Sequence, residues 1–403
     1  MLFCSVARRE NRRITSYVTV FVKLPLLLTP LTYIHVGNAA TGQKSAPESR
    51  KCGRAKYKFS HLLTRFDMLI LTASDIRDMA RHVGLEHFIK KATKALKQDF
   101  SRWSSFHLSP RHATYYPQGV IELMPCTDNK FYTFKYVNGH PGNIRNGKLS
   151  VAAIGQISDA GSGYPLMLCD MTLLTAIRTA ATSVLAASYL ARSDAKSLAV
   201  IGTGAQVEFQ TIAFAGHYAL ETVRYYDIDS LTMSKFARNL VNQPFELKPC
   251  GSIAEALHGA DVVTTATAAK HRQTLFTIQD ISPGTHINAI GGDCPGKTEL
   301  PAELLRQVKL VVEYTPQSLI EGEIQQGDAG LIHAELAELV CGTKIGRDND
   351  REITLFDSVG FALEDFSILR IAYKLATEFK FGTEIAMLPE ADDPKDLFGF
   401  LAS

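Results

Sequence analysis

Two short stretches of the sequence combine residue types that could bind a dinucleotide and move protons. The first is Gly202-Thr-Gly204-Ala205-Gln206, which follows an apolar run and precedes a helical pattern. In a strand–turn–helix unit, such glycines allow a tight turn and a close approach of backbone amides to a pyrophosphate. Val207 stands where a third glycine is common, so the motif alone predicts a cofactor site only weakly, and a structural turn is an equal alternative.

An acidic residue at the end of the next expected strand supports the same site. Asp227 lies 25 residues after Gly202 and is followed by Ile228-Asp229, not by Arg. A carboxylate there accepts hydrogen bonds from ribose hydroxyls and repels a 2′-phosphate, so NAD is favoured over NADP. The alternative is that Asp227 caps the helix expected from Ser230, and the two roles are compatible.

The second stretch places an acid beside two glycines. The apolar run 287–290 leads into Gly291-Gly292-Asp293. Ligands of open α/β sheets bind beyond the carboxyl ends of the strands, and the glycines would leave room for a ring or a substrate. Asp293 is therefore a candidate general acid/base, with a turn aspartate as the alternative. Cys294 has no neighbouring His in the sequence, so we expect a small buried residue and not a nucleophile.

Alternating strand and helix patterns surround both stretches. From residue 197 onward apolar strands alternate with helices, which indicates an α/β fold with a doubly wound, parallel Rossmann sheet. The expected strands are 197–201, 223–227, 261–266, 286–290 and 309–314, and the expected helices are 206–218, 231–241 and 253–257. Residues 111–170 contain short strands punctuated by Pro, Gly and Asn, which is typical of a mostly antiparallel sheet. Helices are expected over 74–106, with Ser74 as N-cap, and over 171–191.

Composition bounds the class of protein. The 403 residues are 46% hydrophobic and 21% charged, which is typical of a globular chain and favours two domains. A net charge of +2 argues against a dedicated nucleic-acid binder. No run reaches the roughly 20 uninterrupted apolar residues of a membrane span. The seven Cys are scattered, which indicates reduced thiols, and no His, Asp or Glu grouping has the spacing of a metal site.

The first 67 residues form a basic leader. They hold 12 Lys and Arg against three acids, a net of +9, and leave −7 for residues 68–403. The Arg-rich start is compatible with an organellar transit peptide, whereas the apolar run 17–28 is more like the hydrophobic region of a secretory signal peptide. An untargeted tail, or a stretch absent from the working protein, is equally open. We expect a folded unit from Met68 and a cytoplasmic location, with organellar targeting as the alternative.

Several longer motifs, in the same order along the chain, resemble the ornithine cyclodeaminase/mu-crystallin family, and above all its bacterial ornithine-cyclising members. The resemblance runs from about Met68 to about Leu375 and leaves residues 1–67 outside. The motifs are residues 119–125, 134–141, 174–183, 291–300, 320–326 and 356–365.

The resemblance implies a role for each matching residue. Arg111 and Lys135, with Arg178 nearby, would hold a substrate α-carboxylate through charge-assisted hydrogen bonds. Glu122 would face the substrate amines, Asp293 would be the catalytic acid/base, and Val359 would line the pocket. The implied NAD contacts are Ser150, Arg178, Gly202, Gly204, Ala205, Gln206, Asp227, Thr267, Ile287, Asn288, Ala289, Ile290, Lys297 and Ser358. Ser150 replaces the Thr that is common in the family, and Gly202-Thr-Gly replaces Gly-Asn-Gly.

Structural alternatives remain open for the polar residues. From its type alone, Lys135 would be a surface residue more often than not. Arg178 lies on an apolar helix and could form a structural ion pair. Glu122 lies between Ile121 and Leu123 in a strand and must point away from both.

The implied activity is a lyase reaction in which NAD-dependent oxidation, cyclisation, deamination and re-reduction convert L-ornithine to L-proline and ammonia. Alternatives within the family are a ketimine reductase, an alanine-type dehydrogenase and a lysine cyclodeaminase. A non-catalytic crystallin-like binding protein is less favoured. Because free amines titrate near pH 10, a basic pH optimum is expected.

The resemblance also implies an organisation of the chain. Residues 68–190, completed by a C-terminal helix at about 361–385, would form an α+β substrate and dimerisation domain. Residues 191–360 would form the NAD-binding domain, and residues 386–403 an acidic tail. A homodimer is expected, with no nucleic-acid or membrane partner.

Overall fold

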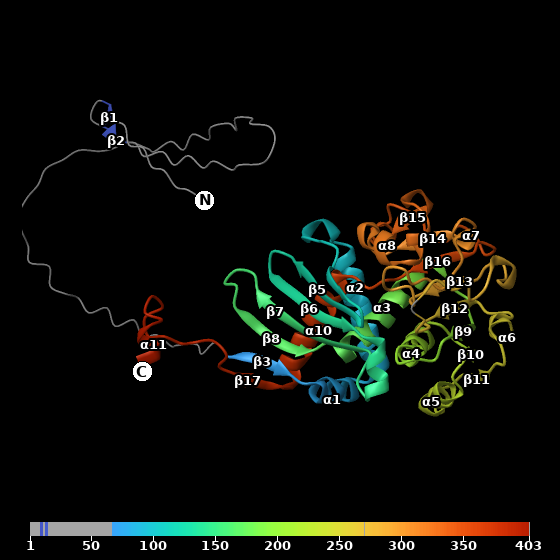
Figure 1. Ribbon diagram of the computed structural model, residues 1–403, viewed down its shortest axis with the longest axis horizontal. Helices are drawn as coiled ribbons and strands as arrows, with labels where there is room; N and C mark the ends of the chain where they lie inside the picture. The colour runs from blue at the N-terminus through green and yellow to red at the C-terminus, as the bar shows by residue number, and fades with distance from the viewer. Residues whose placement is uncertain (1–8, 11–12, 15–66, 270, 403) are drawn as a thin grey trace, which may run out of the picture. The chain divides into compact units, whose positions relative to one another are not determined.

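The computed structural model describes residues 9–10, 13–14, 67–269 and 271–402 (Figure 1). The chain divides into two compact units, residues 1–62 and 63–403. In the first unit, strands β1 (Arg9–Glu10) and β2 (Arg13–Ile14) pair antiparallel. The interpretations of the leader fall almost entirely outside the described residues, so they stay predictions, as does the cytoplasmic location.

A seven-stranded sheet forms one part of the larger unit. Its order is β17-β3-β8-β7-β6-β5-β4, and all neighbours are antiparallel except β3 and β8. The mostly antiparallel sheet predicted for residues 111–170 is thereby confirmed. The strands are β3 (Met68–Leu71), β4 (His112–Tyr116), β5 (Gly119–Thr127), β6 (Phe131–Gly139), β7 (Val151–Asp159), β8 (Pro165–Asp170) and β17 (Thr383–Ile385).

Four helices pack with this sheet. Helix α10 contacts β5, β6 and β7 and also packs against α2 and α3. The helices are α1 (Ala73–Val83), α2 (Leu85–Phe100), α3 (Thr172–Leu190) and α10 (Ala362–Phe379). The prediction of Ser74 as N-cap is wrong: Thr72 caps α1, because its hydroxyl and the Asp75 carboxylate exchange hydrogen bonds with the backbone in a capping box.

Helix α3 is the one helix in the described part of the chain that is long and apolar enough to cross a membrane. Of its most apolar 18-residue stretch, 67% is buried inside the protein. Its side chains belong to the main hydrophobic core, together with those of α2 and α10. Its single charged residue, Arg178, is buried as well.

The second part of the larger unit is an eight-stranded, fully parallel sheet, which confirms the doubly wound fold (Figure 1). Its order is β11-β10-β9-β12-β13-β16-β14-β15. The strands are β9 (Ser197–Ile201), β10 (Thr222–Tyr226), β11 (Glu246–Pro249), β12 (Val262–Thr265), β13 (His286–Ala289), β14 (Lys309–Val312), β15 (Ile332–Glu335) and β16 (Thr354–Asp357). The helices are α4 (Val207–His217), α5 (Ser230–Leu240), α6 (Ile253–Leu257), α7 (Ala302–Leu305), α8 (Thr315–Glu321) and α9 (Leu336–Val340).

The strand order changes direction at β9. The chain runs outward from β9 through β10 to β11, and then returns to place β12 on the other side of β9. Loops that leave neighbouring strands in opposite directions open a crevice at their carboxyl ends, and ligands of such sheets bind there. Strand β16, which the sequence pattern did not predict, lies between β13 and β14 and completes this edge.

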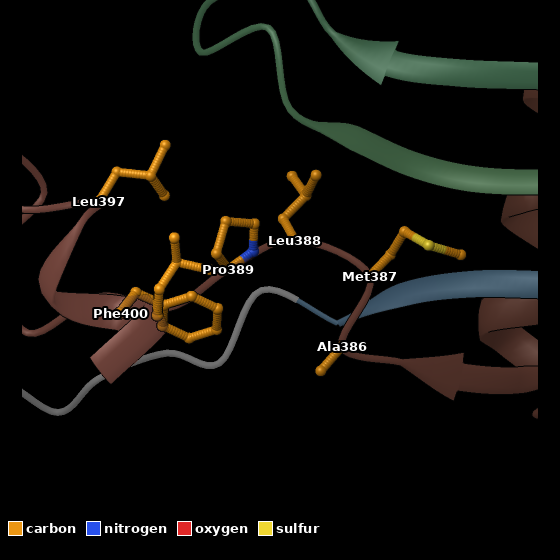
Figure 2. Close-up of a pocket in the computed structure, with 7 residues that line it drawn as sticks. Ala386, Met387, Leu388, Pro389, Leu397 and Phe400 are labelled. Atoms are coloured by element: carbon orange, nitrogen blue, oxygen red, sulfur yellow. The ribbon is translucent and has the colours of Figure 1, made fainter. Parts of the chain in front are cut away.

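The C-terminal helix is shorter than expected. Helix α10 ends at Phe379, because Lys380 and Gly382 adopt left-handed backbone angles with φ of 58° and 88°. The chain then returns as β17, antiparallel to β3. Beyond it lie α11 (Gly399–Ala402) and a small hollow, which Figure 2 shows. The hollow is lined by Ala386, Met387, Leu388, Pro389, Leu397, Phe400 and Leu401, so the predicted site lies elsewhere.

Candidate functional site

The carboxyl edge of the parallel sheet collects the loops that carry most of the predicted cofactor residues. The amides of Ala266, Ile290 and Ser358 donate to the last residues of neighbouring strands at 2.9, 3.1 and 2.9 Å. The Gly202 amide donates to the Tyr226 carbonyl at 2.9 Å. The loops after β9, β10, β12, β13 and β16 therefore lie side by side at one edge.

The glycine turn fits a dinucleotide. Gly202 has a φ of 92°, and a Cβ there would lie 2.6 Å from the Ala266 carbonyl oxygen, so glycine is required. A Cβ on Gly204 would meet nothing within 4 Å. No side chain in the described part of the protein caps the start of α4, which leaves its first amides available to a phosphate. The Asp227 carboxylate accepts from the Thr203 amide at 2.6 Å, which holds an acid beside the turn.

The alternative role of Asp227 as the cap of α5 is wrong. Asp229 caps that helix, because its side chain accepts from the Leu231 amide at 2.8 Å. Asp229 precedes the first helical residue directly, whereas Asp227 lies too far from the helix start.

The two glycines of the turn make a matched pair for mutation. We expect Gly202→Ala to lower the free energy of unfolding by about 1–3 kcal/mol, because alanine would be strained at positive φ and would clash with Ala266. Gly204→Ala should change it by less than about 1 kcal/mol, because the added methyl meets open space. Urea unfolding of both variants measures the difference. Equal stability of the two would contradict this account of the turn.

The remaining predicted cofactor residues differ in how well their positions allow contact with a ligand. Thr267 donates from its amide and hydroxyl to Glu299 at 2.6 and 2.5 Å. Ile287, Asn288 and Ala289 are fully buried in the sheet, so only their backbone can face a ligand, whereas Ile290 is half-buried. The Ser150 carbonyl, before β7, accepts from the His140 amide, and no hydrogen bond joins Ser150 to the other predicted cofactor residues among those described.

Gly291 and Gly292 do not leave room for a substrate. A Cβ on Gly291 would lie 2.1 Å from the Glu299 carboxyl, and one on Gly292 would lie 2.6 Å from the Glu323 carboxyl. The expectation of an open space is therefore wrong: the glycines make room for buried acids. Glu323 in turn accepts from the amides of Glu299 and Leu300 at 2.8 and 3.0 Å, which fixes the segment after Asp293.

Arg111 is the centre of one buried ionic cluster. Its Nη1 donates to Glu122 at 2.9 Å, and its Nη2 donates to the carbonyls of Val359 and Gly360 at 2.6 and 2.7 Å. Its Nε lies 3.0 Å from Glu321 Oε2, an ion-pair distance, although the two atoms are not aligned for a hydrogen bond. Burial opposes the charge, but the two carboxylates outweigh it and raise the pKa of Arg111.

Lys135 and Arg178 meet at a second buried acid. Lys135 Nζ lies 2.9 Å from Asp365, and Arg178 contacts Asp365 and Glu364 at 3.0 and 2.7 Å. The alternative of Lys135 as a surface residue is wrong, because its side chain is 2% exposed and faces α10. Burial lowers the pKa of Lys135 to about 8, despite the attraction of Asp365. Arg178 does form an ion pair.

Glu313 fixes the loop that follows β16. It accepts from the Ser358 hydroxyl at 2.6 Å and from the amides of Val359 and Gly360 at 2.9 Å each. Burial and the neighbouring Glu313 raise the pKa of Glu364. This network connects the predicted pocket residue Val359 to Arg178 through Glu364, so the two ionic clusters share one scaffold.

Asp293 lies at the accessible side of the site. Its side chain is 52% exposed and pairs with Lys297 Nζ at 2.9 Å. Burial of Lys297 opposes its charge, yet Asp293 raises its pKa. The charge of Asp293 also acts on Arg111. Cys294 is half-buried, not buried as expected.

Four acids of the site were missed by the sequence analysis: Glu313, Glu321, Glu364 and Asp365. Glu321 lies in the motif 320–326, and Glu364 and Asp365 lie in the motif 356–365. The motifs therefore pointed to these three residues but did not indicate their functions. Glu313 stands at the end of a strand, and nothing in its sequence context distinguishes it.

Comparison with known proteins agrees with this architecture. The model of the ornithine cyclodeaminase/mu-crystallin family matches residues 74–380. The chain belongs to this family. Among its members, the ornithine cyclodeaminase of Agrobacterium tumefaciens is 50% identical over 319 residues, which is 79% of this chain and 90% of the relative.

Two solved structures resemble this fold closely. A lysine cyclodeaminase structure, solved to explain recognition of L-lysine, L-ornithine and L-2,4-diaminobutyric acid, has a TM-score of 0.78 and 29% identity. The match covers 83% of this chain and 99% of that one. An archaeal alanine dehydrogenase dimer with bound NAD has a TM-score of 0.74 and 30% identity, covering 80% and 100% of the chains.

Proposed function

We propose that this enzyme is an ornithine cyclodeaminase that converts L-ornithine to L-proline and ammonia. The observation that carries the proposal is the buried meeting of three cations, Arg111, Lys135 and Arg178, with acids from α8, β5 and α10. The 50% identity to the Agrobacterium enzyme supports the same conclusion. The three cations would hold the substrate α-carboxylate.

The balance of charge favours a diamino acid. Ornithine carries one carboxylate and two ammonium groups, so its site must offer both cations and anions. Around Arg111 stand Glu122 and Glu321, and the charge of Asp293 also reaches it. A monoamino acid such as alanine would bring no second ammonium group to interact with this acidic surface.

NAD would be held at the carboxyl edge of the parallel sheet. The Gly202 turn and the first amides of α4 would receive its pyrophosphate, and Asp227 would accept from a ribose hydroxyl. Thr267, Ser358 and Lys297, in the neighbouring loops, complete the proposed contacts. When bound there, NAD supplies a temporary acceptor for the hydride of the substrate, with no net redox change.

Within this scheme the protein moves protons and orients the substrate. Asp293, half exposed beside Lys297, would take a proton from a substrate amine and return one to the departing ammonia. Glu122, fixed by Arg111, would orient an amine. Holding the carboxylate and both amines at once would keep the chain curled, which favours attack of the δ-amine on C2.

The outer face of the seven-stranded sheet is proposed as the homodimer interface. Leu123, Tyr136 and Ile154 lie opposite one another on β5, β6 and β7 and are 40%, 40% and 49% exposed. Tyr132 on β6 is 41% exposed as well. Helix α10 covers the opposite face, so this apolar row has no partner among the described residues of the chain.

The full chain should be assayed with L-ornithine and catalytic amounts of NAD+. We expect proline and ammonia in equal amounts, with no net NADH. Steady accumulation of NADH would favour an amino-acid dehydrogenase. A faster reaction with L-lysine would favour a lysine cyclodeaminase, and turnover of a cyclic imine alone would favour a ketimine reductase.

A further inference from the structure

Glu321 is a buried carboxylate at the site, so far considered only for its charge and not for proton transfer. It is the last residue of α8 and is 1% exposed. Its Oε2 atom lies 3.0 Å from Arg111 Nε, yet no aligned donor reaches this oxygen from the residues that the structure describes. A buried carboxylate oxygen without a donor is costly as an anion and is a natural place for a proton.

Glu321 also has a connection to solvent. The side chain of Tyr115, on β4, lies beside its carboxylate and favours the charged form, and Tyr115 is 55% exposed. The other charged groups that act on Glu321 are Arg111, Glu122 and Asp293. Burial, Glu122 and Asp293 favour its neutral form, whereas Arg111 and Tyr115 favour its charged form, and the pKa of Glu321 is raised to about 7.

The proposed reaction needs more than one place for protons. Ornithine starts with two ammonium groups, and each must lose a proton: the α-amine before oxidation at Cα, and the δ-amine before it attacks C2. Two protons are then taken up, one by the released ammonia and one by the ring nitrogen of proline, so the reaction has no net change in protons. Asp293 is a single carboxylate and can hold only one of the two protons that the substrate loses.

We infer that Glu321 is the second proton-transfer group of this site and that it exchanges protons with solvent through the Tyr115 hydroxyl. This inference rests on the proposed function. An N–H bond of a substrate ammonium group breaks and an O–H bond forms at Glu321 Oε2. The Tyr115 hydroxyl then passes a proton outward, and the reverse path returns one after cyclisation.

Glu122 is less suited to this role. Its Oε2 accepts an aligned, charge-assisted hydrogen bond from Arg111 at 2.9 Å, and protonation of the carboxylate would remove its charge and weaken that bond. In Glu321 the oxygen nearest to Arg111 makes no such bond, so a proton can be added there with smaller loss. We therefore assign to Glu122 the orientation of a substrate amine and to Glu321 the exchange of protons.

The test is the pH dependence of proline formation by the full chain and by Glu321→Gln, Tyr115→Phe and the control Glu221→Gln. Glu221 pairs with Lys196 on the surface, away from the site. The wild type should lose kcat below about pH 7, as Glu321 is protonated. Glu321→Gln should lose that limb of the profile and about 10²-fold in kcat, the size of a general-base effect. The control should match the wild type.

The variant Tyr115→Phe provides the second part of this test. Its hydroxyl stabilises the charged form of Glu321, so its loss should move the acidic limb to higher pH. An acidic limb that keeps its midpoint in Glu321→Gln would overturn the inference, whatever the change in rate. An unmoved midpoint in Tyr115→Phe would overturn the path through Tyr115. Absence of proline from the wild type at every pH would instead refute the proposed function.

A measurement without turnover gives an independent check. The folded pKa of Glu321, about 7, lies above that of an unfolded Glu, so the folded state binds more protons between about pH 4.5 and 7. The melting temperature of the wild type relative to Glu321→Gln should therefore fall as pH rises through this window. A constant difference would show that Glu321 does not titrate there, and the inference would fail.

Discussion

Asp293→Asn is expected to lower kcat for proline formation by about 10²- to 10⁴-fold, because asparagine cannot accept a proton from a substrate amine. The fold should survive, since the Asp293 side chain is 52% exposed and the amide oxygen of asparagine can still accept a hydrogen bond from Lys297. The measurement is kcat for the full chain beside its urea unfolding curve. Loss of turnover with an unchanged unfolding midpoint would identify a chemical role.

The matched control is Asp194→Asn. Asp194 is 72% exposed and pairs with Arg192 at 2.9 Å, so it has the same type of partner outside the site. Its substitution should leave kcat unchanged. NAD affinity, measured by calorimetry, should fall by less than about tenfold in Asp293→Asn, because Lys297 keeps its charge. Full turnover by the Asn variant would refute the catalytic assignment of Asp293.

The sequence was most informative where local pattern and topology agree. Apolar runs such as 197–201 and 286–290 predicted strands of the parallel sheet, because buried strands of this kind read as continuous apolar segments. The strand β16 was missed because Thr354 and Asp357 leave it only two consecutive apolar residues, too few to read as a continuous apolar segment. Its central position depends on pairing with β13 and β14, which are distant in sequence.

The site was predictable only in part, for a physical reason. Arg111, Glu122 and Lys135 were identified through the family resemblance, but their partners Glu321 and Asp365 lie about 200 residues or more away. Burial of Lys135 could not be inferred from its strand, because an aromatic strand with one Lys is ordinarily a surface strand. Helix α10 covers this face of the sheet and supplies Asp365, so Lys135 is buried and paired.

Lys135→Met is expected to have two large effects that can be separated. Lys135 is buried against Asp365, and removing one partner of a buried ion pair costs about 3–5 kcal/mol, here reduced by Arg178, which still contacts Asp365. Loss of one charge-assisted hydrogen bond to the substrate carboxylate should also raise the KM for ornithine by roughly 10- to 100-fold. Urea unfolding measures the first effect, and steady-state kinetics measure the second.

The double variant Lys135→Met with Asp365→Asn distinguishes a structural lysine from a substrate-binding one. Removal of both charges eliminates the buried carboxylate that Lys135→Met leaves with one cation fewer, so the double variant should regain part of the stability that Lys135→Met loses. Its KM should stay high, because no cation has been restored to the β6 face of the site. Recovery of stability and KM together would mean that Lys135 serves only to neutralise Asp365. In that case Arg111 and Arg178 alone would hold the substrate carboxylate.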